Sequence, residues 1–174
     1  MKNPVSLEKL KFVRLLLLDV DGVLTDGAII YSHDGGETKI FNVKDGLGLK
    51  LAMRAGIKVG IVTGRKSPAL DHRCRDLGIP YCFAGVQDKA KILEKIVEQT
   101  AVAPEKTAYV GDDLPDLPLM RRVGLSIAVA DADRTVRSNA DWTTSAAGGK
   151  GAAREVCEAL LKARGVWDKI AAKY

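Results

Sequence analysis

The sequence predicts an α/β fold in which helices cover both faces of a parallel sheet. Short apolar runs bounded by turn residues alternate with longer amphipathic stretches along the chain. The first run, residues 12–18, is broken only by Arg14, and its length is typical of a strand buried on both faces. A chain of 174 residues can bury a full core, so we expect a single domain over residues 1–174.

A β-hairpin is expected directly after this strand. Residues 28–31 and 38–43 are strand-like, and the intervening turn, residues 33–36, is rich in glycine. We interpret the hairpin as apolar on both faces, and an isolated two-stranded ribbon is marginal in water. Its side chains therefore need cover from the domain body or from another subunit. We favour another subunit, because a flap over residues 27–43 projects away from the core.

Helices and strands alternate through the rest of the chain. Ser67 and Pro68 have the chemistry of an N-cap and a first helical residue, and Gly78 that of a C-terminal stop. The predicted helices cover residues 45–55, 68–77, 87–100, a segment ending near 122, 133–139 and 152–163; the predicted strands cover 57–62, 81–83, 107–110, 125–130 and 142–144, and a tail covers 165–174. This alternation favours a parallel sheet.

The overall charge indicates an anionic partner of small size. Lys and Arg outnumber Asp and Glu by 27 to 22, giving a net charge of +5. Aromatic residues are only 5% of the chain, and no basic run is longer than two residues. Nucleic-acid binding normally needs a stacking platform or a basic stripe, so we predict no nucleic-acid partner and expect a small anionic substrate.

The remaining composition indicates a cytoplasmic protein. Three cysteines, Cys74, Cys82 and Cys157, lack metal or redox spacing and are predicted to be reduced thiols. No apolar run approaches the length of a membrane span, and residues 1–10 have no signal-peptide pattern. We therefore predict no membrane partner.

Polar residues gather where predicted strands end. Asp19 and Asp21 follow the first strand, Thr63 follows the second, and Asp112 follows the strand at 107–110. In open α/β sheets the ligand site lies outside the carboxyl ends of the strands, so these residues form a candidate site. An isolated Asp-x-Asp-Gly sequence is also common in ordinary turns. The prediction of a site therefore rests on the occurrence of polar residues at several strand ends together.

The combination resembles the four motifs of the haloacid dehalogenase-like superfamily of phosphohydrolases, in order from residue 15 to residue 116. The first motif is Asp19-Val20-Asp21-Gly22-Val23-Leu24-Thr25 and the fourth is Gly111-Asp112-Asp113-Leu114-Pro115-Asp116. The resemblance implies a Rossmann-like parallel sheet. Neither position at which this superfamily inserts a cap domain has room for more than a hairpin, so we expect no cap domain and a lid from a neighbouring subunit.

The resemblance also implies residue roles. Asp19 would attack phosphorus, and Asp21 would protonate the leaving oxygen and later deprotonate water. Thr63 and Lys89 would hold the phosphoryl oxygens. The remaining acidic roles concern the metal: Mg²⁺ would be held by Asp19, Asp112 and the backbone carbonyl of Asp21, with Asp113 and Asp116 orienting the ligands.

Within the superfamily, nearly the whole chain resembles the family of phosphatases for 3-deoxy-D-manno-octulosonate (KDO) 8-phosphate, in lipopolysaccharide synthesis. The matching stretches begin at Asp21, Phe41, Thr63, Gly111 and Gly148. The substrate-contacting positions implied by this resemblance are Asp21, Asn42, Val43, Lys44, Asp45, Gly46, Lys50, Arg65, Arg73 and Lys89. Several Lys and Arg side chains suit a substrate with a phosphate and a carboxylate.

Three alternatives stay open from the sequence: a phosphatase for a nine-carbon keto-deoxy sugar acid, a non-catalytic oligomerisation domain related to nucleotide-sugar transferases, and a phosphoprotein phosphatase. We expect a homo-oligomer, a tetramer in which hairpins pack together.

Two segments near the C-terminal end allow further expectations. Residues 148–151 are either a flexible lead-in to a helix or a loop that touches an active site. Trp167 and Tyr174 are expected to be packing residues.

Overall fold

The computed structural model describes residues 7–174 and has the predicted α/β architecture. A six-stranded sheet with the order β5-β4-β1-β6-β7-β8 forms its centre, and all neighbouring strands in it are parallel. Its strands are β1 (Leu15–Leu18), β4 (Lys58–Thr63), β5 (Tyr81–Ala84), β6 (Thr107–Gly111), β7 (Leu125–Ala128) and β8 (Trp142–Thr143). The predicted parallel sheet is confirmed.

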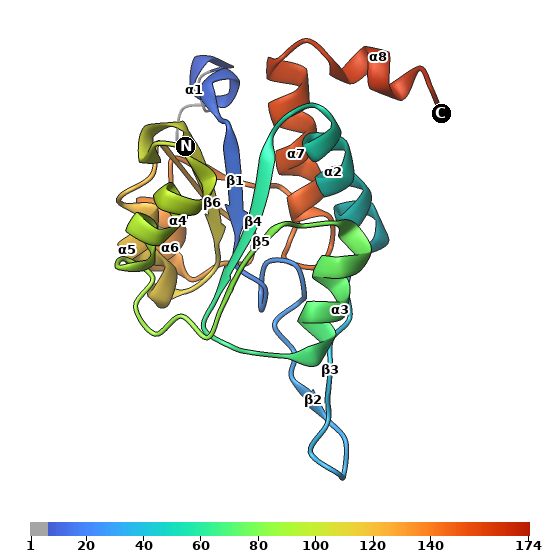
Figure 1. Cartoon of the computed structure of the whole chain (residues 1–174), viewed down its shortest axis with the longest axis vertical. Helices are drawn as coiled ribbons and strands as arrows, with labels where there is room; N and C mark the ends of the chain where they lie inside the picture. The colour runs from blue at the N-terminus through green and yellow to red at the C-terminus, as the bar shows by residue number, and fades with distance from the viewer. Residues whose placement is uncertain (1–6) are drawn as a thin grey trace.

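Helices cover both faces of this sheet. Figure 1 shows α2, α3 and α7 on one side and α4, α5 and α6 on the other. The helices are α1 (Leu7–Phe12), α2 (Val43–Arg54), α3 (Pro68–Leu77), α4 (Ile92–Thr100), α5 (Leu117–Met120), α6 (Arg134–Asn139), α7 (Ala152–Ala163) and α8 (Trp167–Ala171), with 3₁₀ turns η1 (Pro104–Lys106) and η2 (Leu114–Asp116). None of the helices within residues 7–174 is long and apolar enough to cross a membrane.

Strand β1 lies at the centre of the core, paired with β4 on one side and β6 on the other. Its four leucines are completely buried. Burying one leucine side chain stabilises a fold by about 1.5–3 kcal/mol, so the strand is firmly anchored. Because the strand cannot shift, the residue that follows it, Asp19, has a fixed position at the edge of the sheet.

The boundary predicted for the first strand was wrong. The apolar run 12–18 begins with the end of α1, and Phe12 is 54% exposed. Arg14 lies between the helix and the strand, where its guanidinium donates to the carbonyl of Lys11 at 2.8 Å and so stabilises the end of α1. Only Leu15–Leu18 form the strand.

The helix predicted over residues 87–100 also begins later, at Ile92. The carboxylate of Asp88 accepts the backbone N–H of Ala90 at 3.0 Å, which stabilises a turn in place of the first helical turn. Lys89 therefore lies in a turn, and its side chain is buried.

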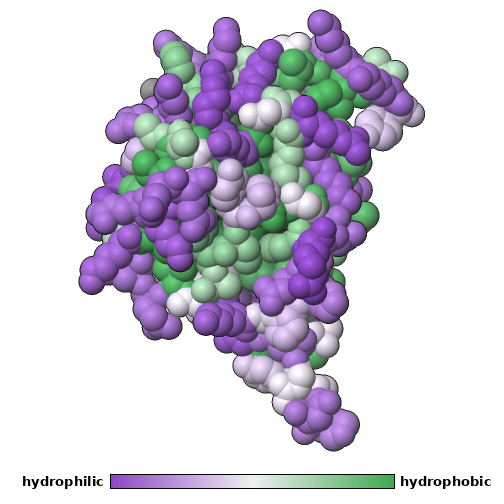
Figure 2. Space-filling view, in the orientation of Figure 1, coloured by the Kyte–Doolittle hydropathy of each residue, from purple (hydrophilic) through white to green (hydrophobic). Residues whose placement is uncertain are grey.

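The predicted hairpin is present but short. Strand β2 (Ile30–Tyr31) pairs antiparallel with β3 (Glu37–Thr38). Figure 1 shows the hairpin projecting from the body of the molecule, at the end opposite α1 and α8, and the same projection is visible in Figure 2. The carboxyl ends of the sheet strands lie toward the base of the hairpin, so the hairpin is next to the predicted site.

The other features named from the sequence are also placed. The described cysteines are free thiols, with Cys74 and Cys157 buried and Cys82 exposed. The tail contains α8, and the ring of Trp167 lies 5.2 Å from the guanidinium carbon of Arg154, a packing contact with α7.

Candidate active site

A cavity of about 370 Å³ opens at the carboxyl ends of β1, β4 and β6. The chain runs from β1 outward to β5 and then returns to place β6 on the other side of β1, so the strand order reverses here. The cavity lining includes eight residues predicted from the sequence: Asp19, Asp21, Thr63, Arg65, Lys89, Asp112, Asp113 and Asp116. Side chains from four separate stretches of the sequence therefore meet at one place.

The carboxylate of Asp19 is oriented by its neighbours. The backbone N–H of Val20 donates to Oδ1 at 2.7 Å, and the ammonium of Lys89 donates to Oδ2 at 2.7 Å. The backbone N–H of Asp19 itself donates to the carbonyl of Val110 at 3.0 Å. Both ends of the residue are fixed relative to the sheet.

Asp116 supports this arrangement from below. Its Oδ1 accepts hydrogen bonds from Lys89 Nζ at 2.6 Å and from the hydroxyl of Tyr109. Its Oδ2 accepts the backbone N–H groups of Asp112 at 2.8 Å and Asp113 at 3.2 Å. Asp116 thus positions the ammonium and the loop that carries Asp112, whereas the exposed Asp113 caps η2 through the N–H of Leu114.

Tyr109 was missed by the sequence analysis. It is completely buried on β6, and its hydroxyl contacts both Lys89 and Asp116. A tyrosine in an otherwise apolar, fully buried strand needs a polar partner for its hydroxyl, and that requirement was the available signal.

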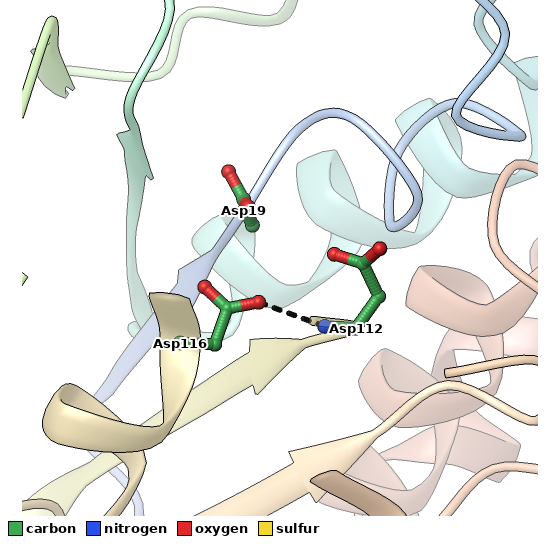
Figure 3. Close-up of side chains that lie close together, drawn as sticks. All are labelled: Asp19, Asp112 and Asp116. Atoms are coloured by element: carbon green, nitrogen blue, oxygen red, sulfur yellow. Dashed lines mark hydrogen bonds between the residues drawn. The ribbon is translucent and has the colours of Figure 1, made fainter. Parts of the chain in front are cut away.

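Three carboxylates form a candidate metal site. Asp19, Asp112 and Asp116 each offer an oxygen, and these oxygens lie within 4.8 Å of one another (Figure 3). Burial, together with the charge of Asp116, raises the pKa of Asp19 to about 6 and that of Asp112 to about 8. Three carboxylates thus lie beside one ammonium, that of Lys89.

The donor set fits Mg²⁺, which prefers carboxylate and carbonyl oxygens. Each oxygen of Asp116 accepts two hydrogen bonds and its side chain is 1% exposed, whereas each oxygen of Asp19 accepts one and its side chain is 14% exposed. Asp19 and Asp112 are therefore the better placed ligands. A divalent cation between the carboxylates of Asp19 and Asp112 would reduce the repulsion between their negative charges.

The loop after β4 has the geometry of an anion site. Thr63 is buried at the end of the strand, and its Oγ1 accepts the backbone N–H of Arg65 at 3.3 Å. The loop leads to α3, whose N-cap Ser67 makes no side-chain capping bond. Thr63, Gly64 and Arg65 of this loop line the cavity, where their backbone N–H groups could bind an anion.

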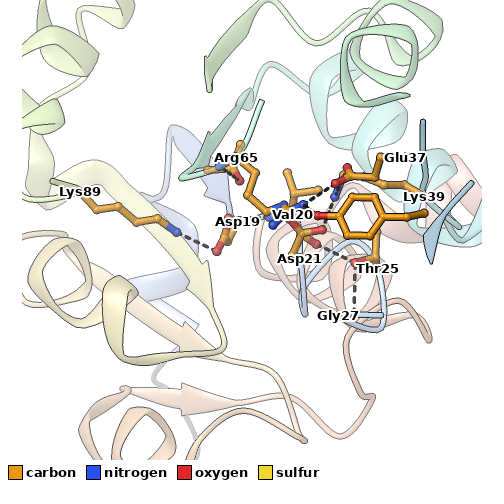
Figure 4. Close-up of polar contacts among 11 residues, drawn as sticks. Asp19, Val20, Asp21, Thr25, Gly27, Glu37, Lys39, Arg65 and Lys89 are labelled. Carbon is orange, nitrogen blue, oxygen red and sulfur yellow. Dashed lines mark hydrogen bonds and ion pairs between the residues drawn. The ribbon is translucent and has the colours of Figure 1, made fainter. Parts of the chain in front are cut away.

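Asp21 faces the hairpin (Figure 4). Its carboxylate forms an ion pair with Lys39, and Oδ2 lies 3.7 Å from Nε of Arg65. Arg65 also donates to Glu37 of the hairpin and, at 3.1 Å, to the hydroxyl of Tyr31. The hairpin is thus not apolar on both faces, and Glu37 and Lys39 were missed, although two charges on an apolar ribbon were a visible signal.

Seven predicted substrate-contacting residues lie outside this cavity: Asn42, Val43, Lys44, Asp45, Gly46, Lys50 and Arg73. Asn42 caps α2 by accepting the N–H of Lys44 at 2.8 Å and donates to the carbonyl of Gly149 at 3.2 Å. The buried Asp45 accepts the N–H of Arg154 at 2.7 Å, and Arg73 donates to the carbonyl of Asn42 at 3.2 Å. Val43 and Lys44 are exposed and Lys50 is half-buried. Their role toward substrate stays a prediction.

The glycine loop at 148–151 contacts the first motif of its own chain. The N–H of Gly149 donates to the carbonyl of Val23 at 2.9 Å. A Cβ atom at Gly148 would lie 1.8 Å from the carbonyl oxygen of Gly22, so only glycine permits this approach. The loop supports the backbone that follows Asp19.

Comparison with known proteins agrees with this geometry. A family described as haloacid dehalogenase-like hydrolase matches residues 83–156. The KDO 8-phosphate phosphatase KdsC of Salmonella typhimurium is 48% identical over 167 residues, covering 96% of this chain and 89% of that protein. This chain belongs to the KDO 8-phosphate phosphatase family. KdsC of Escherichia coli K12 is also 48% identical, over 170 residues covering 96% of this chain and 90% of its own.

Solved structures of KDO 8-phosphate phosphatases share the fold. The enzyme from Moraxella catarrhalis, solved in complex with a magnesium ion, a phosphate ion and KDO, is 42% identical with a TM-score of 0.93 and covers 96% of each chain. The enzyme from Yersinia pestis is 41% identical with a TM-score of 0.91, covering 93% of this chain and 88% of that one. As in the predicted fold, no cap domain is evident in residues 7–174.

Gly22→Ala is expected to weaken Mg²⁺ binding by about 10- to 100-fold, the scale for disturbing residues that orient metal ligands. Gly22 has φ of +84°, and an added Cβ would lie 2.0 Å from Oδ2 of Asp112. Gly56→Ala is a matched control, because Gly56 has φ of +80° and nothing within 4 Å of its Cβ position. Calorimetric titration with Mg²⁺ measures the effect, and equal affinity in the two variants would contradict it.

Proposed function

We propose that this phosphatase family member hydrolyses KDO 8-phosphate to KDO and phosphate with the help of Mg²⁺. The observation that carries the proposal is the contact of Asp19 with Lys89 in a cavity that also contains Thr63 and Asp112. A nucleophilic carboxylate, phosphate-binding donors and metal-binding oxygens are the three elements that phosphomonoester hydrolysis requires.

Hydrolysis proceeds in two displacements at phosphorus. Oδ of Asp19 attacks the phosphoryl group, a P–O bond to Asp19 forms and the bond to the sugar oxygen breaks. Water then attacks the aspartyl-phosphate, releases phosphate and restores Asp19. When bound, Mg²⁺ supplies charge neutralisation for the phosphoryl oxygens, and Lys89, Thr63 and the N–H groups after it bind these oxygens.

Asp21 serves both steps as acid and base. It lies two residues beyond the nucleophile and lines the same cavity, on the side toward the hairpin. It gives its proton to the departing sugar oxygen and then takes a proton from the attacking water.

The nature of the substrate is supported by the relatives and by surplus positive charge. The Moraxella relative was solved with KDO, and the curated relatives are named for KDO 8-phosphate. Arg65 lines the cavity beside the phosphate-binding loop and suits the carboxylate of the sugar acid. The nine-carbon acid, the non-catalytic domain and the phosphoprotein phosphatase are less favoured, and we place the enzyme in cytoplasmic lipopolysaccharide synthesis.

Asp19→Asn is expected to lower phosphate release from KDO 8-phosphate by several orders of magnitude, because an amide cannot form the acyl phosphate. Asp71→Asn, on the exposed face of α3, is the control and should keep wild-type turnover. The assay includes a nine-carbon keto-deoxy acid phosphate and a phosphopeptide beside KDO 8-phosphate. A wild-type preference for either competitor would overturn the assigned substrate.

Arg65→Ala and Arg73→Ala should have different effects, the first mainly on catalysis and the second mainly on thermal stability. Arg65→Ala is expected to lower kcat/KM for KDO 8-phosphate by about 2 kcal/mol of transition-state binding, with a smaller effect on p-nitrophenyl phosphate. Arg73 already donates to Asn42 and, at 3.0 Å, to Asp76, so its loss should lower Tm more than it alters substrate preference. Steady-state kinetics and thermal unfolding distinguish the two, and the reverse pattern would make Arg73 the carboxylate-reading residue.

We also propose that the enzyme is a homo-oligomer, a tetramer, assembled through the hairpin. Apolar side chains gather on the hairpin and at the start of α2 and are exposed in the single chain. Ile40 is 65% exposed and Val43 is 79% exposed. The others are Ile29, Ile30, Tyr31 and Leu47. Side chains of this kind in one region are typical of a subunit interface.

The double variant Ile30→Asp, Ile40→Asp is expected to dissociate the oligomer and to reduce turnover at the same time, because a neighbouring hairpin would close the site. Analytical ultracentrifugation at the assay concentration measures the assembly. Leu7→Asp in α1, which replaces a side chain that is 71% exposed, is the control. A fully active wild-type monomer would refute the proposal.

A further inference from the structure

The hairpin brings two charged side chains into the active site of its own chain. Glu37 lies on β3 and Lys39 follows it, and their side chains are only 12% and 3% exposed. The apolar hairpin residues Ile30 and Ile40 are 43% and 65% exposed. In a two-stranded ribbon the apolar side chains are usually covered and the charged ones lie in water, and this hairpin shows the reverse. The burial of Glu37 and Lys39 therefore indicates that they have a role in the site.

Lys39 lies between two carboxylates. Its ammonium forms an ion pair with Oδ1 of Asp21 and lies 3.1 Å from Oε1 of Glu37 (Figure 4). Arg65 approaches the other oxygen of Asp21 at 3.7 Å. Asp21, which transfers protons in the proposed function, therefore contacts a positive side chain at each carboxylate oxygen. One of these side chains, that of Lys39, comes from the hairpin.

Glu37 holds Arg65 in turn. One terminal nitrogen of the guanidinium donates to Oε2 of Glu37 and to the hydroxyl of Tyr31, both on the hairpin. The Arg65 contact, foremost among its causes, lowers the pKa of Glu37 to about 2. Nε of Arg65 is buried, has no hydrogen-bond partner among the described residues and lies 3.7 Å from Oδ2 of Asp21. The guanidinium is therefore fixed by the hairpin at one terminal nitrogen, while the side chain, which is 40% exposed, lines the cavity in which a substrate would bind.

We propose that Glu37 and Lys39 are positioning residues of the phosphatase, Lys39 for the acid–base carboxylate of Asp21 and Glu37 for the substrate-binding guanidinium of Arg65. The proposal rests on the proposed function and extends it, because it assigns the hairpin a task within its own chain in addition to any contact with a neighbour. The two residues are two positions apart in the chain, yet they act on different steps.

The two roles predict different kinetic changes. Asp21 takes part in bond breaking and in water activation, so loss of Lys39 should act on kcat. Arg65 binds the sugar acid, so loss of Glu37 should act on KM. A charge-assisted hydrogen bond at either place corresponds to about a 10- to 100-fold effect. General damage to the hairpin would change both parameters in the same way in both variants.

The experiment compares Lys39→Met and Glu37→Gln, which keep the length of each side chain, with the control variants Lys95→Met and Glu94→Gln. Both control residues are exposed on α4. For each purified protein, kcat and KM are measured with KDO 8-phosphate at saturating Mg²⁺, and Tm and the oligomeric state are recorded. Lys39→Arg and Glu37→Asp, which retain the charges, serve if the first pair is poorly folded.

Lys39→Met is expected to lower kcat by about 10- to 100-fold with KM within about threefold, and Glu37→Gln to raise KM by about tenfold with kcat within about threefold. Lys39→Arg should recover part of kcat. Kinetic constants equal to those of the controls, or the same change in both hairpin variants, would overturn the proposal. A wild-type protein that is inactive on KDO 8-phosphate but active on another sugar phosphate would refute the substrate alone, and the comparison would be repeated with that substrate.

Discussion

The ammonium of Lys89 is the interaction on which the site depends. It lies 2.7 Å from Asp19 and 2.6 Å from Asp116, in surroundings that are largely shielded from water. Although burial opposes its charge, Asp116 and Asp19 raise the pKa of Lys89, so it remains an ammonium. Without that charge, buried carboxylates would face each other uncompensated, a state that typically costs several kcal/mol.

The same contacts give the site its order. Asp116 uses one oxygen for Lys89 and Tyr109 and the other for the backbone at Asp112, so a single buried carboxylate joins the turn that carries Lys89 to the end of β6. Asp19 then has one oxygen fixed by Lys89. Asp19, Asp112 and Asp116 share one ammonium, that of Lys89, and burial together with the charge of Asp116 raises the pKa of Asp19 and of Asp112. A cation with a charge of two would stabilise the charged forms of these carboxylates.

The sequence was sufficient for the sheet and for the residues that meet at its carboxyl edge. Buried parallel strands such as Leu15–Leu18 are continuous apolar runs, and the residue after each strand must lie at the same edge, so Asp19, Thr63 and Asp112 could be placed together. Periodicity was less informative where side chains competed with the backbone. Asp88 replaced the start of a helix by a turn, and that exchange of hydrogen bonds is what lets Lys89 reach the site.

Contacts made across the chain were beyond the reach of sequence patterns. Lys39 meets Asp21 because of how the hairpin folds back, and no local spacing encodes that angle. Within the motif that the family resemblance assigned to substrate, Asn42 and Asp45 also bind the loop and helix that follow residue 147, and no local pattern indicated these contacts. Residues of that stretch therefore support the fold around the site, and only their hydrogen-bond partners in the structure reveal this.

The lining of the cavity suggests how substrate specificity can arise without a cap domain: some residues bind the phosphate and others can contact the sugar. In the proposed mechanism, Asp19, Thr63 and Lys89, which line the cavity, engage the phosphoryl group that all phosphate esters share. Groups that can distinguish one sugar from another must lie at the rim, and there the positions of Arg65 and Asp21 depend on Glu37 and Lys39. Because the hairpin also exposes apolar side chains, a neighbouring subunit that covered them would restrict the same strand. Assembly and substrate recognition would then be coupled through a ribbon of a few residues.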